Sequence, residues 1–149
     1  ILSVAERDNC LYVFEELYGS ERDTAEWIEA ANERGYDRRL LMVCDSAEPD
    51  RIKTWVRAGY RAVGVKKYAG SVNGQIDRLK RYNMIYIDCS CVNTLREARE
   101  WKWKQGKSGR FIDVAETHND DAMAALRYSG DLFASSSAEM RTLGARRRR

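Results

Sequence analysis

The sequence is poor in residues that break helices, cross-link chains or titrate near neutral pH. Its 149 residues include one proline, four cysteines and one histidine. No apolar run approaches the roughly 20 residues that a membrane-spanning helix needs, so we expect no membrane protein. Hydrophobic residues make up 44% and charged residues 33% of the chain, a balance that allows a buried core and excludes disorder as the main state. The length suits one domain.

Several functional classes lack their usual signatures. Cys89 and Cys91 form a C-x-C pair, which has too few thiols at the wrong spacing for a zinc site, and Cys10 and Cys44 stand alone. Such cysteines fit a reducing, cytosolic setting. Neither a G-x-x-x-x-G-K-[S/T] phosphate loop nor a G-x-G-x-x-G segment after a strand occurs, which disfavours an ATPase or dinucleotide role within this chain. The net charge of +3 does not by itself indicate nucleic acid.

The pattern of apolar residues predicts an opening hairpin followed by alternating strands and helices. Residues 1–7 and 10–17 read as two strands joined by a tight turn at Asp8-Asn9. Short apolar runs predict parallel strands that are buried on both faces. We expect these strands at 40–44, 60–65 and 84–87, and helices that begin at Ser20 or Thr24, near Pro49, at Ser71, at Asn93 or Thr94, and near Asn119. The helix from Asn93 or Thr94 includes Trp101, residues 105–110 form a glycine-rich turn, and the last helix ends near Phe133.

Acidic side chains stand where the predicted strands end, which is where open α/β sheets gather ligands and catalytic groups. Asp45 and Asp88 each directly follow a strand, and Asp120 and Asp121 begin the last predicted helix. Each also has a simpler interpretation, because Asp45 or Ser46 can cap the next helix and acids at a helix start favour the helix dipole. Position alone leaves both interpretations open.

Basic residues and the single histidine are the remaining candidates. Lys66 and Lys67 follow a strand, and Lys102 and Lys104 alternate with tryptophans. Such cations can contact phosphates beside aromatic rings, or they can simply face solvent. His118 lies in a predicted loop without a partnered Cys or Ser, so we expect no nucleophile–base pair.

Four segments carry a resemblance to a known family: MVCDSAEPDRI, GVKKYAGSVNGQIDRLK, IYIDCSCVNTLREAREWKWK and HNDDAMAALRYS. Together and in this order they resemble the C-terminal nuclease domain of the large terminase subunit of tailed bacteriophages. The resemblance extends from the opening hairpin to the last helix. That family has a ribonuclease-H-like fold and cuts concatemeric DNA during genome packaging, using two divalent metal ions held by acidic residues.

The resemblance implies catalytic residues at Asp45 and Asp121 and metal ligands at Asp45, Asp120 and Asp121. Aligning Arg127-Tyr128 with the family's R-Y pair places Asp121 where the family often has His, and Ala124 where it has its last catalytic Asp. Alanine cannot bind a metal. Ala124 is therefore an engineered or natural loss, or Asp120 or Asp121 substitutes from one turn earlier.

A second departure concerns the first strand of the family. Its G-x-D-x-G-like segment, which carries the first metal-binding Asp on the central strand, is expected just before Ile1. Without it, the hairpin and the parallel strands lack their shared neighbour. We expect an α/β, ribonuclease-H-like mixed sheet, with an antiparallel hairpin followed by parallel strands and flanking helices, over residues 1–134. Residues 135–149 read as a basic, disordered tail, and an ATPase motor domain is expected upstream in the same polypeptide.

The resemblance further implies two-metal hydrolysis of double-stranded DNA with Mg²⁺ or Mn²⁺, activity being in question because of Ala124. Lys66, Lys67, Lys102 and Lys104 would hold the DNA backbone. The small terminase subunit and the portal are the expected protein partners, and the cytoplasm of the infected bacterial host is the expected location. The alternative is a non-catalytic DNA-binding or portal-docking domain on the same fold. The antiparallel hairpin argues against a receiver-like domain.

Overall fold

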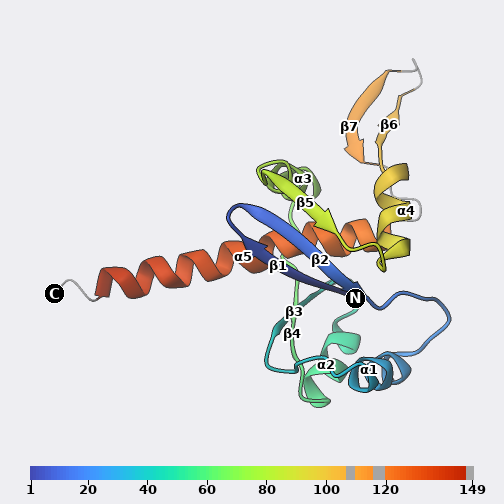
Figure 1. The fold of residues 1–149 in the computed structure, drawn as a ribbon, viewed down its shortest axis with the longest axis vertical. Helices are drawn as coiled ribbons and strands as arrows, with labels where there is room; N and C mark the ends of the chain where they lie inside the picture. Colours follow the sequence, from blue (N-terminus) through green and yellow to red (C-terminus); the bar gives the residue numbers. More distant parts are fainter. Residues whose placement is uncertain (107–109, 116–119, 147–149) are drawn as a thin grey trace.

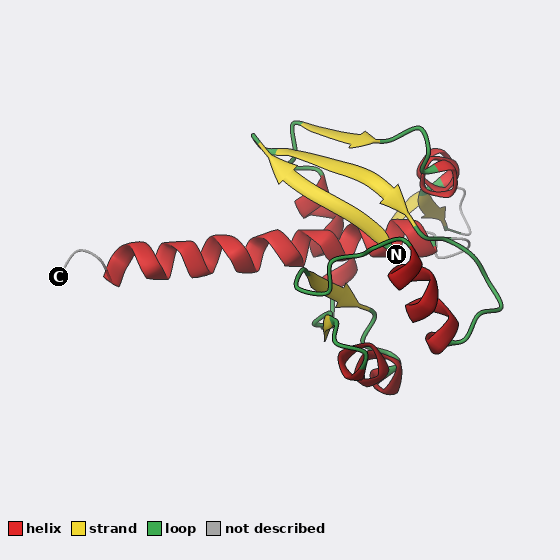
Figure 2. Cartoon of the chain, turned by 60° about the horizontal axis from the view of Figure 1, so that its bottom comes forward, coloured by secondary structure: helices red, strands yellow, loops and turns green. Residues whose placement is uncertain are grey.

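A computed structural model describes residues 1–106, 110–115 and 120–146, the last of them from residue 134 onward as backbone only. Strands and helices alternate along this part of the chain (Figures 1 and 2). The strands are β1 (Leu2–Arg7), β2 (Cys10–Glu16), β3 (Leu41–Cys44), β4 (Arg61–Gly64), β5 (Met84–Ile87), β6 (Trp103–Gln105) and β7 (Phe111–Ala115). The helices are α1 (Thr24–Glu33), α2 (Pro49–Arg57), α3 (Ser71–Leu79), α4 (Val92–Glu100) and α5 (Asp121–Arg146).

The opening hairpin forms as predicted and takes β5 as a parallel neighbour. β1 and β2 are antiparallel, and β2 pairs in parallel with β5 to give the order β1-β2-β5. Asp8 and Asn9 adopt φ values of 52° and 57°, as a two-residue type I′ turn requires of both central residues. The mixed α/β class is thereby confirmed.

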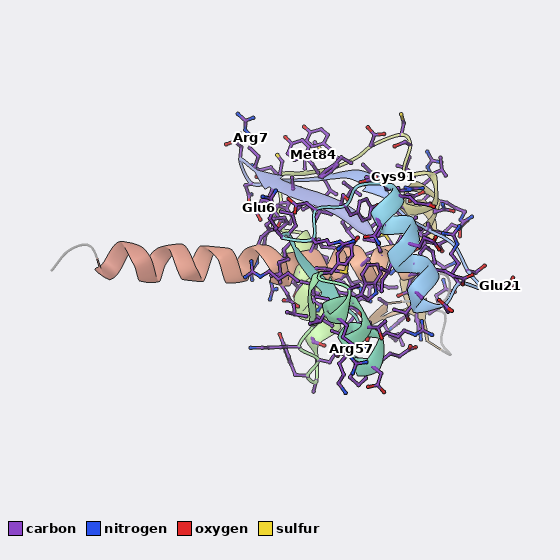
Figure 3. All side chains as sticks on the ribbon, turned by 90° about the horizontal axis from the view of Figure 1, so that it is seen from below. Glu6, Arg7, Glu21, Arg57, Met84 and Cys91 are labelled. Atoms are coloured by element: carbon purple, nitrogen blue, oxygen red, sulfur yellow. The ribbon has the colours of Figure 1, made fainter. Side chains whose placement is uncertain are left out.

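The parallel pair β3–β4 is separate from the hairpin sheet. Among the described residues, β3 pairs with β4 and β1 pairs with β2, and no strand joins β1 to β3. This is the arrangement expected when hairpin and parallel strands have no shared neighbour. Helix α5 contacts both β1 and β3 and so connects the two sheets. In Figure 3, Arg7 and Met84 mark the hairpin sheet on one side of α5, and Arg57 marks α2 on the other.

The core has two parts, one on each side of this division. Leu11 and Val13 of β2 pack with Leu79, Cys91, Met123 and Leu126. The second part lies under α1 and α2 and consists of Leu17, Ala30, Ala31, Trp55, Tyr60 and Ala62. Each sheet therefore has its own buried face, and α5 adds its apolar side to the first.

The prediction that the parallel strands are buried on both faces was wrong. β3 is half-buried throughout, and in β4 only Ala62 is buried. Each of these strands has a single strand neighbour in the described residues, so apolar side chains such as Val63 stay 42% exposed. An unbroken apolar run fits such a pair as well as it fits a central strand.

The helix expected to include Trp101 ends earlier, at Glu100. Trp101 takes an extended conformation (φ −69°, ψ 123°), and the chain continues into β6. β6 pairs antiparallel with β7, a hairpin that we did not predict around the glycine-rich turn. The alternation of Trp and Lys over 101–104 therefore has the period of a strand, with side chains on opposite faces.

Three helix starts also differ from the prediction. The N-cap residue of α4 is Cys91, where Asn93 or Thr94 was expected. Asp23 caps α1, accepting a hydrogen bond from the Glu26 amide in a capping box that replaces the expected Ser20 or Thr24. Gly70, with φ 80°, precedes α3 where Ser71 was expected to cap. Pro49 begins α2 as predicted.

Helix α5 is longer than expected, since it continues to Arg146 through residues that we assigned to a disordered tail. The only proline of the chain is Pro49, so no proline lies within α5 to remove a backbone hydrogen bond or to kink the helix. The domain boundary at residues 134 and 135 stays a prediction. No helix in the described part of the chain is long and apolar enough to span a membrane.

Two carboxylates hold the starts of α4 and α5. Glu16, at the end of β2, accepts hydrogen bonds from the backbone amides of Asn93 (2.9 Å) and Thr94 (2.8 Å), and also from both of their side chains. Glu97 of α4 in turn accepts from the amides of Ala122 (2.8 Å) and Met123 (3.1 Å). Anions at these positions satisfy amides that have no partner inside their own helix.

Glu97 is the more critical of the two because its side chain is 2% exposed. It also accepts a hydrogen bond of 2.7 Å from the Tyr18 hydroxyl, and this bond, together with burial, raises the pKa of Tyr18 to about 12. We expect Glu97→Ala to lower the free energy of unfolding by roughly 2–4 kcal/mol, because two buried amides and the half-buried Tyr18 hydroxyl lose their partner. Urea denaturation measures this loss. The exposed Glu100→Ala on the same helix is the control, and an equal loss in both variants would contradict the assignment.

Glu16 predicts a contribution to stability that depends on pH. Burial raises the pKa of Glu16, but the hydrogen bonds from Asn93 and Thr94 outweigh it and hold the pKa below 4.5. A depressed pKa stabilises the fold above the unfolded value and loses that effect as the pH falls through the folded value. We therefore expect unfolding free energies measured between pH 7 and pH 3 to fall less steeply in Glu16→Gln than in the parent.

The control for this titration is Glu33→Gln, which changes an exposed side chain of α1. In this variant the free energy of unfolding should fall between pH 7 and pH 3 as steeply as in the parent. If the free energy of unfolding falls with pH as steeply in Glu16→Gln as in the parent, the Glu16 carboxylate is not the source of the pH dependence.

Candidate functional site

Asp45 is the centre of the candidate site and lies directly after β3. The end of this strand is fixed by its neighbour, because the Val65 amide donates to the Cys44 carbonyl at 2.8 Å. The same pairing brings the segment after β4 alongside Asp45. Lys67 Nζ lies 2.5 Å from Asp45 Oδ1, and the pair is about half exposed, at 46% for Lys67 and 51% for Asp45.

Two further donors fix the Asp45 carboxylate. The Ala47 amide donates to Oδ1 at 2.7 Å, and the Tyr128 hydroxyl of α5 donates to Oδ2 at 3.0 Å. Burial raises the pKa of Asp45, but the bonds from Lys67, Ala47 and Tyr128 prevail and lower it below 3.8. Burial and the bond to Asp45 raise the pKa of Tyr128 to about 12, so this hydroxyl keeps its proton.

Asp45 does not cap the following helix, which was its simpler interpretation. The N-cap residue of α2 is Glu48, and no side chain makes a capping hydrogen bond there. Asp45 instead closes a local turn through the Ala47 amide. Its exposed carboxylate is therefore available for a role other than capping.

Tyr128 determines which part of α5 faces Asp45. Side chains of a helix lean toward its N-terminus, so the hydroxyl of a tyrosine lies over the preceding turn. The residue one turn before Tyr128 on the same face is Ala124. Position 124 therefore lies on the same face of α5 as Tyr128, and alanine offers no donor or ligand there.

Asp120 pairs with Arg127, although it is also close enough to Tyr128 to help raise the pKa of that hydroxyl. Its Oδ2 lies 3.7 Å from a terminal nitrogen of Arg127, whose side chain is only 7% exposed. Arg127 also donates to Gln75 of α3 at 3.0 Å, and so it links α5 to α3. Asp120 serves as the counter-ion of a buried arginine, which argues against its substituting for a metal ligand at position 124.

Asp121 is exposed in the first turn of α5. At a rise of 1.5 Å per residue, it lies about 10 Å along the helix axis from Tyr128, against about 6 Å for Ala124. It shares a surface depression with Arg51 of α2 and Trp55. No contact between Asp121 and Asp45 occurs among the described residues, so a catalytic role for Asp121 stays a prediction.

The side chains around Asp45 do not by themselves supply the ligands that two metal ions need. Carboxylate oxygens are the hard ligands that Mg²⁺ and Mn²⁺ prefer, and Asp45 offers such a ligand. Among the side chains that the structure describes, no group of three or more His, Cys, Asp or Glu could hold a metal ion. At Asp45 the charged neighbour is the Lys67 ammonium and not a second carboxylate.

The predicted basic residues fall into two places. Lys66 and Lys67 follow β4 beside Asp45, and Lys66 is exposed. Lys102 and Lys104 lie at the β6–β7 hairpin, which Figure 1 shows on the other side of α5 from β3 and β4. The structure does not bring the two pairs together, and their contact with DNA stays a prediction.

The other acidic and histidine candidates add nothing to this site. Asp88 follows β5 and accepts hydrogen bonds from the amide (2.8 Å) and hydroxyl (2.6 Å) of Ser90, which lower its pKa. This is a local turn, in line with its simpler interpretation. His118 lies outside the described residues.

Sequence reasoning missed Tyr128 as a partner of Asp45 and assigned Lys67 to DNA alone. Tyr128 entered only as part of an alignment anchor. Its position one turn after residue 124 was the available signal, because residues four apart share a helix face. The contact between Lys67 and Asp45 had no such signal, since 22 residues separate them.

Comparisons with known proteins agree on one family. The family model described as "Terminase RNAseH like domain" matches residues 2–131. The chain is 27% identical over 130 residues to the PBSX phage terminase large subunit of Bacillus subtilis (strain 168). That match covers 87% of this chain and spans 30% of the length of the relative.

A solved structure has the same fold. The nuclease domain of the large terminase g2p from bacteriophage SPP1, with bound Mn, matches with a TM-score of 0.76 and 24% sequence identity. The match covers 85% of this chain and 73% of that one. The predicted ribonuclease-H-like fold is thereby confirmed.

Tyr128→Phe tests the geometry at Asp45 without emptying the space that the ring fills. Losing the hydroxyl removes one of the bonds that favour the carboxylate, so we expect the pKa of Asp45 to rise toward its ordinary value of 3.8. A carboxyl ¹³C NMR titration measures it. The pKa of Asp88 serves as an internal control, and an unchanged Asp45 pKa would contradict the contact.

Proposed function

Because the chain belongs to the terminase ribonuclease-H-like domain family, we propose that it is the DNA-cutting domain of a phage packaging terminase. Its reaction is hydrolysis of phosphodiester bonds in concatemeric double-stranded DNA, with Mg²⁺ or Mn²⁺ as cofactor. The observation that carries the proposal is the acid at the end of β3, whose carboxylate accepts a hydrogen bond from Tyr128 of α5. The proposal predicts that the residue at position 124 governs activity.

Asp45 is the proposed ligand for a divalent ion. Two of its fixed donors, the Ala47 amide and the Tyr128 hydroxyl, orient the carboxylate and hold it ionised. A bound divalent ion supplies Lewis-acid activation of the phosphate and of water. The described residues do not complete a two-ion arrangement, so we expect the sequence with Ala124 to cleave DNA weakly or not at all. The Mn in the SPP1 nuclease domain supports the choice of cofactor.

DNA is the proposed substrate, and lysines beside the site are its proposed contacts. Lys66 is exposed and adjacent to Lys67, the ion-pair partner of Asp45, whereas Lys102 and Lys104 lie apart from it at the β6–β7 hairpin. Contacts of this kind are made to phosphates and carry little sequence information. Selection of the cutting site therefore falls to a partner or to the packaging motor.

The larger assembly is proposed from the relatives. The chain matches 30% of the PBSX phage terminase large subunit, so an ATPase motor domain in the same polypeptide fits the remaining length. The small terminase subunit and the portal are the proposed protein partners. Packaging of phage DNA takes place in the cytoplasm of the infected bacterial host, which is the proposed location.

A second candidate function is non-catalytic DNA binding or portal docking on the same fold. Ala124 favours it, because loss of a ligand is expected where cutting is no longer needed. This alternative predicts DNA binding with a steep salt dependence and no metal-dependent cleavage.

Ala124→Asp tests the two functions directly. We expect it to raise plasmid cleavage in Mn²⁺ by about tenfold or more, because a carboxylate next to Asp45 adds a metal ligand worth several kcal/mol of transition-state stabilisation. The rate of conversion of supercoiled to nicked and linear plasmid is the measurement. Adding Asp45→Ala to this variant should abolish the gain.

The matched control is Ala125→Asp, which places the same charge one residue further and about 100° around the helix. It should not restore cleavage. If Ala124→Asp remains inactive while DNA binding weakens steeply with salt, the non-catalytic function is the better account.

A further inference from the structure

The cation that neutralises Asp45 belongs to the protein itself. Lys67 Nζ contacts Asp45 Oδ1 at 2.5 Å, and the Ala47 amide shares that oxygen. The other oxygen accepts from Tyr128. Each oxygen of the carboxylate therefore has a donor, and Lys67 is the one that carries a full charge.

The contact depends on the fold and not on neighbouring sequence. The segment 65–67 runs along the end of β3 because Val65 continues the β3–β4 pairing through the Cys44 carbonyl. Lys66, the adjacent residue, is exposed and makes no ion pair within the described part of the chain. Alternate side chains of an extended segment point to opposite sides, so only one of two successive lysines faces Asp45.

We propose that Lys67 is an intramolecular counter-ion of Asp45 that competes with a divalent metal ion for the same carboxylate. The proposal rests on the proposed function, in which Asp45 is the metal ligand. The Ala47 amide and Lys67 already share Oδ1, and the ammonium repels a divalent ion at either oxygen, so a metal ion that binds Asp45 has to displace Lys67 or bind against its charge. Lys67 is thus a positioning residue that orients the carboxylate in the absence of metal.

The strength of the competition follows from exposure. Ion pairs that are about half exposed contribute little, because water and salt screen them. Lys67 therefore weakens metal binding by a modest factor and does not prevent it. Removing the ammonium should tighten Mn²⁺ binding by about two- to fivefold.

The experiment is a titration of the purified chain with Mn²⁺, in which free Mn²⁺ is measured by electron paramagnetic resonance. Lys67→Ala is compared with the parent and with Lys66→Ala, which removes one positive charge from the adjacent residue. We expect tighter binding in Lys67→Ala, parent-like binding in Lys67→Arg, and no gain in Lys66→Ala. Asp45→Asn in the Lys67→Ala background should remove the gain.

Two results would overturn the proposal. One is an equal affinity for Mn²⁺ in Lys67→Ala and Lys66→Ala. That result would mean that Mn²⁺ binding responds only to the net charge of the chain, or does not respond to either lysine. The other is a gain that survives Asp45→Asn, which would place the ion elsewhere. The proposed nuclease function is judged separately, by plasmid cleavage in Ala124→Asp, so either idea can fail without the other.

Discussion

The buried carboxylate of Glu97 is the interaction on which the arrangement of the site depends. It lies on α4, receives the hydroxyl of Tyr18 from the segment after β2, and accepts the first amides of α5. Three separate parts of the chain thus meet at one charge that water does not reach. Because helix α5 begins at this charge, its rotation and starting residue are fixed, and with them the residues that face β3.

The position of α5 gives the site its chemical character. Arg127 faces α3 and takes Asp120 as its counter-ion, while Tyr128 faces β3 and binds Asp45. Successive residues of a helix lie about 100° apart, so these two side chains necessarily serve different neighbours. The face that Tyr128 shares with Ala124 is the one directed at Asp45. With alanine in place of a carboxylate at position 124, the charged partner of Asp45 is Lys67.

The local features were the ones that the sequence predicted well. Asp8 and Asn9 favour positive φ and gave the hairpin, Pro49 marked the start of α2, and Asp45 was placed at the end of its strand. The β6–β7 hairpin was missed because alternating Trp and Lys over 101–104 was read with the period of the preceding helix. The Asp23 cap was missed because several residues of that loop are capable caps, and only the geometry selects one.

The sequence by itself determined the order of strands and helices, the family resemblance and the absence of a carboxylate at position 124, because these depend on local periodicity and residue identity. Tertiary structure alone decided that β5 joins the hairpin while β3 and β4 form a separate pair. It also decided that Lys67 and Tyr128 are the partners of Asp45, across 22 and 83 residues of chain. The physical reason is that hydrogen bonds and ion pairs act only at contact distance. Which distant residues reach that distance is set by the packing of α5 against both sheets.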